Sequence, residues 1–128
     1  MRSQASRGTI FTDVTQATGD RIQTVTSATF DPLVLQCRGP IAVEFMSYGC
    51  AYCRELEPVL QQVAGMLPSQ GKVCRVNIGV EEELAADYGV HGTPTLVMFL
   101  EGKEVGRAEG LEASVDGVMA VMRQAFGR

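Results

Sequence analysis

The chain has 128 residues, which is the size of one compact domain. Its composition is 45% hydrophobic and 20% charged, as in globular proteins, and this excludes a collagen-like or wholly disordered chain. The formal net charge of −4 argues against a nucleic-acid-binding protein, because phosphate binding needs a basic stripe and the sequence has none. No apolar run is long enough for a membrane-spanning helix.

The N-terminal segment is rich in Ser, Thr and Gln and lacks the apolar stretch of a secretory signal. We therefore expect residues 1–21 to form a flexible arm ahead of one domain over residues 22–128. We also expect a cytoplasmic protein, or a periplasmic one if a signal peptide has been removed. The four cysteines are too few and too unevenly spaced for a disulfide scaffold, so they indicate chemistry or packing.

Apolar periodicity along the chain predicts alternating strands and helices. Strands are expected at 21–26, 41–46, 72–78, 95–100 and 104–108. Helices are expected at 29–37, 50–67, 81–89 and 115–126, and Pro58 should kink the second of them. This order predicts an α/β fold with a central mixed sheet, in which parallel strands are followed by a C-terminal antiparallel hairpin and helices flank both faces.

Cys50 and Cys53 carry the strongest chemical signal, because they follow a buried strand and open a helix. Their spacing puts the second sulfur one helical turn after the first, close enough for a disulfide. The free N–H groups and the dipole at the start of the helix favour a thiolate at Cys50, which is the attacking species in disulfide exchange. Cys53 would then resolve the mixed disulfide. The alternatives are half of a zinc site or two buried thiols.

Glu44 is the one acidic residue in the apolar strand at 41–46. A buried carboxylate has a raised pKa and can relay a proton to or from Cys53 when the mixed disulfide resolves. The alternative is an acid that pairs with Lys72 or Arg75 across the sheet.

The segment His91–Pro94 precedes a buried strand, and its X-Pro bond is a candidate cis peptide. His91 either tunes the Cys50 thiolate or is a solvated loop residue. Cys74 has the position of a small core residue, and Cys37 that of a bystander or a modifiable thiol. A metal-binding module would need Cys50, Cys53, Cys74 and His91 as ligands, but the intervals of 21 and 17 residues match no common zinc pattern.

Together these features resemble the thioredoxin family. The resemblance runs from about Thr29 to Phe126 and covers most of the chain. Besides the cysteine pair, the matching positions are Pro58, Asn77-Ile78, Tyr88-Gly89-Val90, Thr93-Pro94-Thr95-Leu96 and Gly102. The resemblance implies a thioredoxin fold in which Pro94 is cis and lies against the cysteines, where its backbone pairs with a substrate polypeptide.

The resemblance also implies a thiol–disulfide oxidoreductase that needs no cofactor beyond a Cys50–Cys53 disulfide. Cys50 would be the nucleophile and Cys53 the resolving thiol, with Glu44 as the third catalytic residue. The substrate-binding residues would be Gly92, Thr93, Pro94, Tyr48 and Tyr52. The expected partners are protein disulfides and a thioredoxin reductase or another thiol–disulfide protein, and we expect a monomer that binds neither nucleic acid nor a membrane.

The sequence departs from the usual family pattern around the cysteines. Ala51-Tyr52 replaces the usual Gly-Pro between them, no Trp precedes them, and Glu44 replaces the usual Asp. The Tyr before the second cysteine, and Thr93 before the proline, look more like glutaredoxins or periplasmic disulfide isomerases. We favour a thioredoxin-type reductant of protein disulfides. The alternatives are a periplasmic disulfide oxidant or isomerase, the metal-binding module described above, and a thioredoxin-fold interaction domain with incidental cysteines.

Overall fold

The computed structural model describes residues 19–127. Within them, five strands form the sheet: β3 (Gln23–Thr24), β4 (Pro40–Met46), β5 (Lys72–Asn77), β6 (Thr95–Leu100) and β7 (Lys103–Glu109). The helical segments are η1 (Asp31–Leu35), α1 (Ala51–Met66), α2 (Glu82–Asp87) and α3 (Val115–Phe126). Strands and helices alternate as far as β6, and a hairpin and a last helix follow, as the apolar periodicity predicts.

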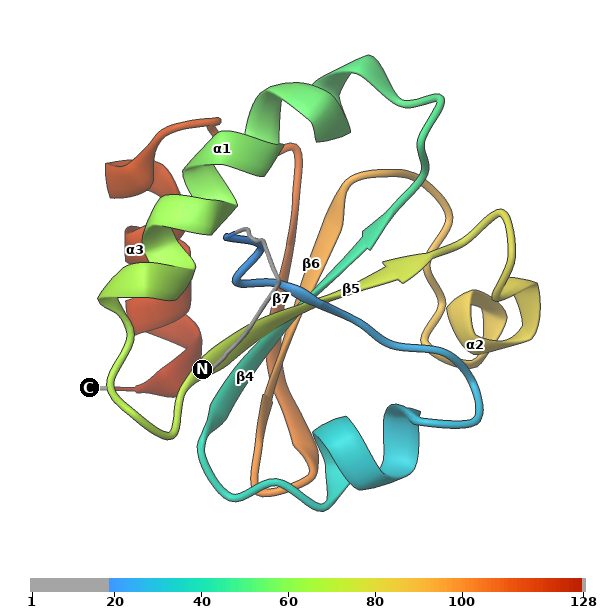
Figure 1. Ribbon diagram of the computed structural model, residues 1–128, viewed down its shortest axis with the longest axis horizontal. Helices are drawn as coiled ribbons and strands as arrows, with labels where there is room; N and C mark the ends of the chain where they lie inside the picture. The colour runs from blue at the N-terminus through green and yellow to red at the C-terminus, as the bar shows by residue number, and fades with distance from the viewer. Residues whose placement is uncertain (1–18, 128) are drawn as a thin grey trace, which may run out of the picture.

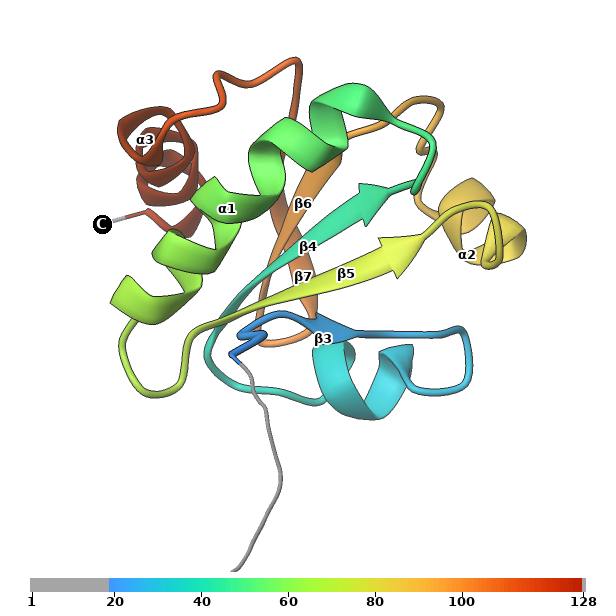
Figure 2. The ribbon, with the colours of Figure 1, turned by 45° about the horizontal axis from the view of Figure 1, so that its top comes forward.

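The sheet is mixed and has the strand order β3-β5-β4-β6-β7. Strands β3, β5 and β4 are parallel, whereas β6 runs antiparallel to β4 and β7 antiparallel to β6. Helices α1 and α3 cover one face, and η1 and α2 cover the other, as Figures 1 and 2 show. The prediction of parallel strands followed by an antiparallel hairpin, with helices on both faces, is therefore confirmed. No helix in this part of the chain is long and apolar enough to cross a membrane.

Two apolar clusters hold the helices against the sheet. Beneath α1 and α3, the fully or almost fully buried helix side chains are Leu56, Leu60, Val63, Val118 and Met122. On the opposite face, the ring of Tyr88 packs edge-on against Phe99, with ring centroids 5.4 Å apart. Each fully buried side chain of this size contributes about 1.5–3 kcal/mol to folding, so both helix layers are firmly attached.

The first helical segment is shorter than the helix expected at 29–37. It is a single π-helical turn, in which the N–H of Gln36 donates to the carbonyl of Asp31 at 3.0 Å. Pro32 lies in its first turn, where a helix tolerates proline because the first N–H groups have no partner within the helix. The periodicity of the apolar residues predicts the position of this turn but not its length or its π-helical hydrogen bonding.

The N-terminal strand is also shorter than the strand expected to start at Arg21. It is confined to the two residues of β3, which pair with Cys74 and Arg75 of β5. The N–H of Arg21 donates to Gln61 of α1 at 2.9 Å, so the last residues of the expected arm contact the domain. The first 18 residues of that arm lie outside the described part of the chain.

The functional side chains lie near one edge of the sheet, the one formed by the C-terminal ends of the parallel strands β4 and β5. Both strands point toward this edge, and α1 begins there after the turn that follows β4 (Figure 2). The β4–α1 connection brings Cys50 to this edge, and Glu44 lies on β4, two residues before the strand ends. The strand at the centre of the sheet and the helix packed on it thus form a rigid frame for the site.

Candidate active site

Cys50 is the N-cap residue of α1 and has an extended backbone, with φ −91° and ψ 113°. Its Sγ accepts a hydrogen bond from the N–H of Cys53 at 3.1 Å, and both cysteines are free thiols. Partial burial by itself raises the pKa of Cys50. Hydrogen bonds from Cys53, Thr93 and the backbone lower the pKa by more than burial raises it, so the net pKa is below its usual value. A sulfur at this position receives the unpaired N–H groups of the first helical turn, so its thiolate is stabilised.

Cys53 lies in the first turn of α1 and its side chain is buried. Burial, followed by the hydrogen bond shared with Cys50, raises the pKa of Cys53 to about 11. The two sulfurs therefore differ in chemistry: the half-buried one ionises readily and the buried one keeps its proton. This difference is what an attacking thiol and a later, resolving thiol need.

Glu44 is buried at the centre of the sheet, with only 1% of its surface exposed. It is in register with Arg75 on the neighbouring strand β5, yet neither of its carboxylate oxygens has a hydrogen-bond partner among residues 19–127. Burial, reinforced by the negative charge of Glu57, raises the pKa of Glu44 to about 7, although the positive charge of Arg75 opposes the shift. The alternative of a carboxylate hydrogen-bonded to Lys72 or Arg75 is not what the structure contains.

The Thr93–Pro94 peptide bond lies beside the start of β6 and is cis, as the sequence predicts. The hydroxyl of Thr95 donates to the carbonyl of Gly92 at 2.7 Å and fixes the preceding loop. A hollow of about 210 Å³ opens here; its lining residues are Tyr52, Gly92, Thr93, Pro94, Thr95, Glu109 and Gly110. All of the predicted substrate-binding residues except Tyr48 therefore line this hollow.

Tyr52 and Tyr48 lie on different sides of the cysteine pair. The hydroxyl of Tyr52 donates to the carbonyl of Leu111 at 2.5 Å, which connects α1 to the loop after β7. Tyr48 is 68% exposed, and its carbonyl accepts a hydrogen bond from Arg54 at 2.9 Å. The exposed ring of Tyr48 is available to a docking polypeptide, whereas Tyr52 is partly held by its hydroxyl.

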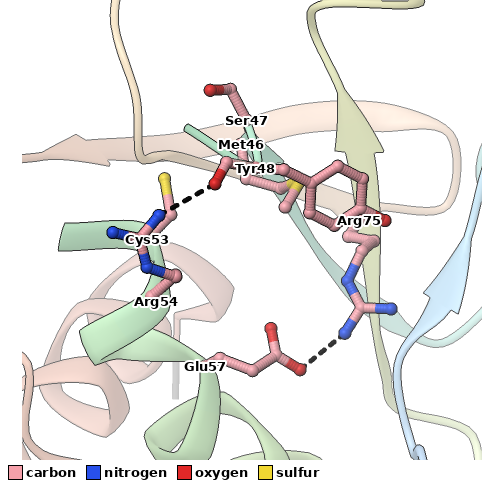
Figure 3. A pocket seen from close by; sticks show the side chains of 7 residues that line it. All are labelled: Met46, Ser47, Tyr48, Cys53, Arg54, Glu57 and Arg75. Carbon is pink, nitrogen blue, oxygen red and sulfur yellow. Dashed lines mark hydrogen bonds and ion pairs between the residues drawn. The ribbon is translucent and has the colours of Figure 1, made fainter. Parts of the chain in front are cut away.

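A second cavity, of about 280 Å³, lies on the Tyr48 side of the buried thiol (Figure 3). Its lining residues are Met46, Ser47, Tyr48, Cys53, Arg54, Glu57 and Arg75. The guanidinium of Arg75 is in contact with the carboxylate of Glu57, with Nη2 and Oε2 2.6 Å apart. This cavity puts an ion pair next to Cys53.

The other residues singled out by the sequence lie apart from the cysteine pair or at its margin. Cys74 is fully buried in the core, which raises its pKa to about 11, and the Sγ of half-buried Cys37 donates to the carbonyl of Leu33 at 3.1 Å. His91 is exposed, one residue before Gly92. In the described residues no three His, Cys, Asp or Glu side chains are grouped as metal ligands.

Sequence reasoning missed the polar network around Arg75. The guanidinium binds Glu57 and Asp20, and Gln61 joins those two carboxylates. Glu57 follows Cys53 by four residues, a spacing that puts both on one helix face and could have drawn attention to it. The contact with Asp20 spans 55 residues of sequence, and no local pattern indicates it.

Comparisons with known proteins agree with this geometry. The family model described as Thioredoxin matches residues 21–124. The chain is 37% identical over 83 residues to the thioredoxin of Pseudomonas aeruginosa, covering 65% of this chain and 77% of that protein. It is also 35% identical over 74 residues to protein disulfide isomerase-like 2-3 of Oryza sativa, covering 58% of this chain but only 17% of that protein.

A solved structure supports the same conclusion. A point mutant of thioredoxin from Halobacterium salinarum superposes with a TM-score of 0.73 at 27% identity, covering 87% of this chain and 96% of the other. The chain belongs to the thioredoxin family. It is a thiol–disulfide oxidoreductase that works through its own cysteines, and protein disulfides and a reductase are its general classes of partner.

Proposed function

We propose that this protein reduces disulfide bonds in other proteins, with Cys50 as the nucleophile and Cys53 as the resolving thiol. The observation that carries the proposal is the asymmetry of the pair. Cys50 caps a helix, is half-buried and has a lowered pKa, whereas Cys53 is buried with a pKa of about 11. The half-buried Cys50 thiolate attacks first, and the protonated thiol of Cys53, one turn along the helix, reacts in the second step.

The reaction has two exchange steps. The Cys50 thiolate attacks one sulfur of the substrate disulfide, the substrate S–S bond breaks, and the other substrate sulfur leaves as a thiolate. Cys53 then loses its proton and attacks Cys50, and the bond between Cys50 and the substrate breaks. The substrate gains two electrons, the protein is left with a Cys50–Cys53 disulfide, and a reductase partner restores the two thiols.

Glu44 takes the proton of Cys53 in the second step. A carboxylate with a pKa of about 7 is half ionised near neutral pH and is a far better base than an exposed carboxylate. Its oxygens make no other hydrogen bond among residues 19–127 and are therefore free to accept. The proton lies on Glu44 until the site opens to solvent again.

The substrate lies along the hollow beside the cis proline. Backbone groups of Gly92, Thr93 and Pro94 pair with an extended segment of the substrate, which brings its sulfur to Cys50. Tyr48 and Tyr52 flank this path and supply apolar contact area. A reductant of this kind needs a compartment that keeps thiols reduced, so the proposal places the protein in the cytoplasm.

Single-cysteine variants test these roles. With a disulfide-bonded protein such as insulin, Cys53→Ser should accumulate a mixed disulfide on Cys50, and Cys50→Ser should accumulate none and show no turnover. Cys37→Ser is the matched control, because that thiol is half-buried and bonded to Leu33, and it should retain full turnover. Substantial turnover by Cys50→Ser would refute the nucleophile assignment.

One observation favours a second candidate function, net disulfide formation or isomerisation. Hydrogen bonding by Thr93 helps to lower the pKa of Cys50, and stabilising the reduced form in this way makes a cysteine pair more oxidising. The reduction potential separates the two functions. A value near about −270 mV indicates a reductant, whereas a value above about −200 mV indicates an oxidant or isomerase.

A further inference from the structure

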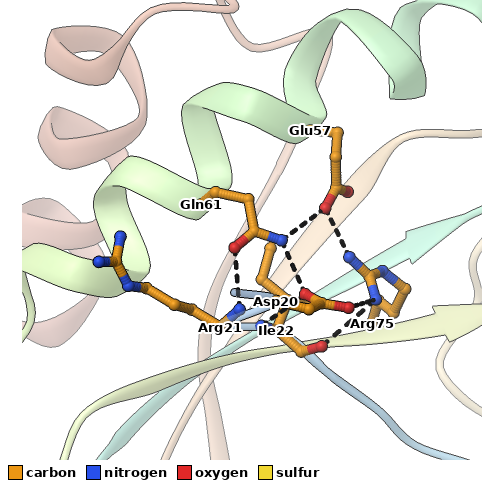
Figure 4. A network of polar contacts seen from close by, with 6 residues as sticks. All are labelled: Asp20, Arg21, Ile22, Glu57, Gln61 and Arg75. Atoms are coloured by element: carbon orange, nitrogen blue, oxygen red, sulfur yellow. Dashed lines mark hydrogen bonds and ion pairs between the residues drawn. The ribbon is translucent and has the colours of Figure 1, made fainter. Parts of the chain in front are cut away.

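The polar network at Glu57 and Arg75 lies outside the reaction described above, yet it borders the same cavity as Cys53. Figure 4 shows Arg75 reaching from β5 to Glu57 on α1 and to Asp20 near the N-terminus. Nη2 is 2.6 Å from Glu57 Oε2, and Nη1 is 3.1 Å from Asp20 Oδ2 and 3.3 Å from the carbonyl of Ile22. Both terminal nitrogens of the guanidinium are therefore occupied.

Among residues 19–127, this arrangement leaves the buried carboxylate of Glu44 without an ion-pair partner. Glu44 and Arg75 are paired in register on adjacent parallel strands, so their side chains leave the same face of the sheet. The side chain of Glu44 is fully buried, whereas those of Glu57 and Asp20 are 35% and 59% exposed. Arg75 nevertheless binds the two exposed carboxylates, and both oxygens of Glu44 stay unpartnered among the described residues.

We propose that Glu57 is a positioning residue for the resolving step: it holds the guanidinium of Arg75 against α1 and so leaves Glu44 free to take the proton of Cys53. The proposal rests on the proposed function, because it assigns Glu57 a role through Glu44. Glu57 is suited to this role, since it lies four residues after Cys53 on the same face of α1 and faces the same cavity.

The groups around Glu44 all bear on this proposal. The N-cap residue Cys50 and Glu57 of α1 disfavour the ionised form of Glu44, and β5 contributes Arg75, which favours it. The opposite neighbour, β6, presents the uncharged Leu96 in register with Glu44. Glu57 therefore raises the pKa of Glu44 in two ways: its own negative charge opposes ionisation of Glu44, and its ion pair holds the positive charge of Arg75 on Glu57 instead of Glu44.

The test is a direct titration of Glu44 by ¹³C NMR of its carboxyl carbon in the reduced protein. Glu57→Gln frees Arg75 to turn toward Glu44, and an opposite charge within reach lowers a carboxyl pKa by about 1 pH unit or more. Glu55→Gln is the matched control, because it removes the same charge from an exposed site two residues away on α1 and should leave Glu44 unchanged. Asp20→Asn removes the charge of the other carboxylate bound to Arg75, at a side chain that is 59% exposed, and should shift the pKa of Glu44 in the same direction as Glu57→Gln.

The kinetic readout is the pH profile of the resolving step. A mixed disulfide between Cys50 and thionitrobenzoate releases a coloured thiolate when Cys53 attacks. Glu57→Gln should move the midpoint of this profile to lower pH and reduce the plateau rate, because Glu44 becomes a weaker base. In a Glu44→Gln background, Glu57→Gln should have no further effect on the midpoint.

Two results separate the possible failures. If the pKa of Glu44 is the same in Glu57→Gln as in Glu55→Gln, the positioning role of Glu57 is refuted whatever the rates are. If instead Glu44→Gln leaves the resolving rate and its pH profile unchanged, the proton-accepting role of Glu44 in the proposed function is refuted. A shift that persists in the Glu44→Gln background would mean that Glu57 acts directly on Cys53 and would also overturn the proposal.

Discussion

The buried carboxylate of Glu44 should make the stability of the reduced protein depend on pH with a definite sign. Its pKa is about 7 in the folded state against an ordinary value of 4.5. Below pH 4.5 the group is protonated in both states, so its full contribution to stability is present. As the pH rises through 7, the unfolded chain loses the proton more readily than the folded protein does, and that contribution is lost.

The size of the effect follows from the two pKa values. A difference of about 2.5 pH units corresponds to about 3 kcal/mol of unfolding free energy between about pH 4 and pH 8.5. The side chain is almost fully buried, so screening by water reduces this figure little. Glu44→Gln carries a neutral amide at every pH, so its unfolding free energy should lack the pH dependence that Glu44 causes.

Denaturant unfolding of wild type and Glu44→Gln across this pH range measures the difference directly, because the other titrating groups are common to both proteins. The unfolding free energy of Glu44→Gln relative to wild type should grow by about 3 kcal/mol from about pH 4 to pH 8.5. Glu55→Gln, which alters an exposed carboxylate on α1, should show no such trend. A constant difference between Glu44→Gln and wild type at all pH values would refute the assignment of a raised pKa to Glu44.

Three other local features can be tested separately. Iodoacetamide at neutral pH should alkylate Cys50 in the folded protein well before Cys74, whose buried thiol has a pKa of about 11, and mass spectrometry of a digest that found equal rates would contradict this. Tyr52→Phe should lower the unfolding free energy by about 1 kcal/mol through loss of the hydrogen bond to Leu111, and an unchanged denaturation midpoint would mean that this bond adds nothing. Gly39→Ala should destabilise by about 1–3 kcal/mol, since a Cβ there would clash with the main-chain oxygen of Gln70 in the α1–β5 loop, and an unchanged melting temperature would show that the loop yields easily.

Much of the fold could be predicted because its elements carry a local pattern. The run 41–46 is apolar on both faces, and β4 occupies Pro40–Met46 at the centre of the sheet. The helical period after Cys50 likewise gives α1 almost to the residue. Strand β3 and the turn η1 were less predictable, since two paired residues and one wide turn are too short for a period to develop.

In the site, too, the sequence could predict the residues that lie close together in the chain but not the contacts between distant residues. Cys50 and Cys53 are recognisable because strand, spacing and helix start are contiguous in sequence. The register of Glu44 opposite Arg75 could also be anticipated from parallel pairing, but the hydrogen-bond partners of Arg75 could not. They lie 18 and 55 residues away, and only the packed fold brings Glu57 and Asp20 together around one guanidinium.

The distribution of charge around Arg75 is itself an argument that Glu44 serves chemistry rather than stability. The carboxylates of Glu44, Glu57 and Asp20 lie near the guanidinium of Arg75, and a direct contact with Arg75 would offset part of the cost of burying the carboxylate of Glu44. In the structure, Arg75 instead binds the more exposed carboxylates of Glu57 and Asp20, where solvent screens the attraction. Glu44 has no hydrogen-bond partner among the described residues. A local arrangement that gives up stability without another structural gain is expected at functional sites, and here the loss falls on Glu44, the residue proposed as the base for Cys53.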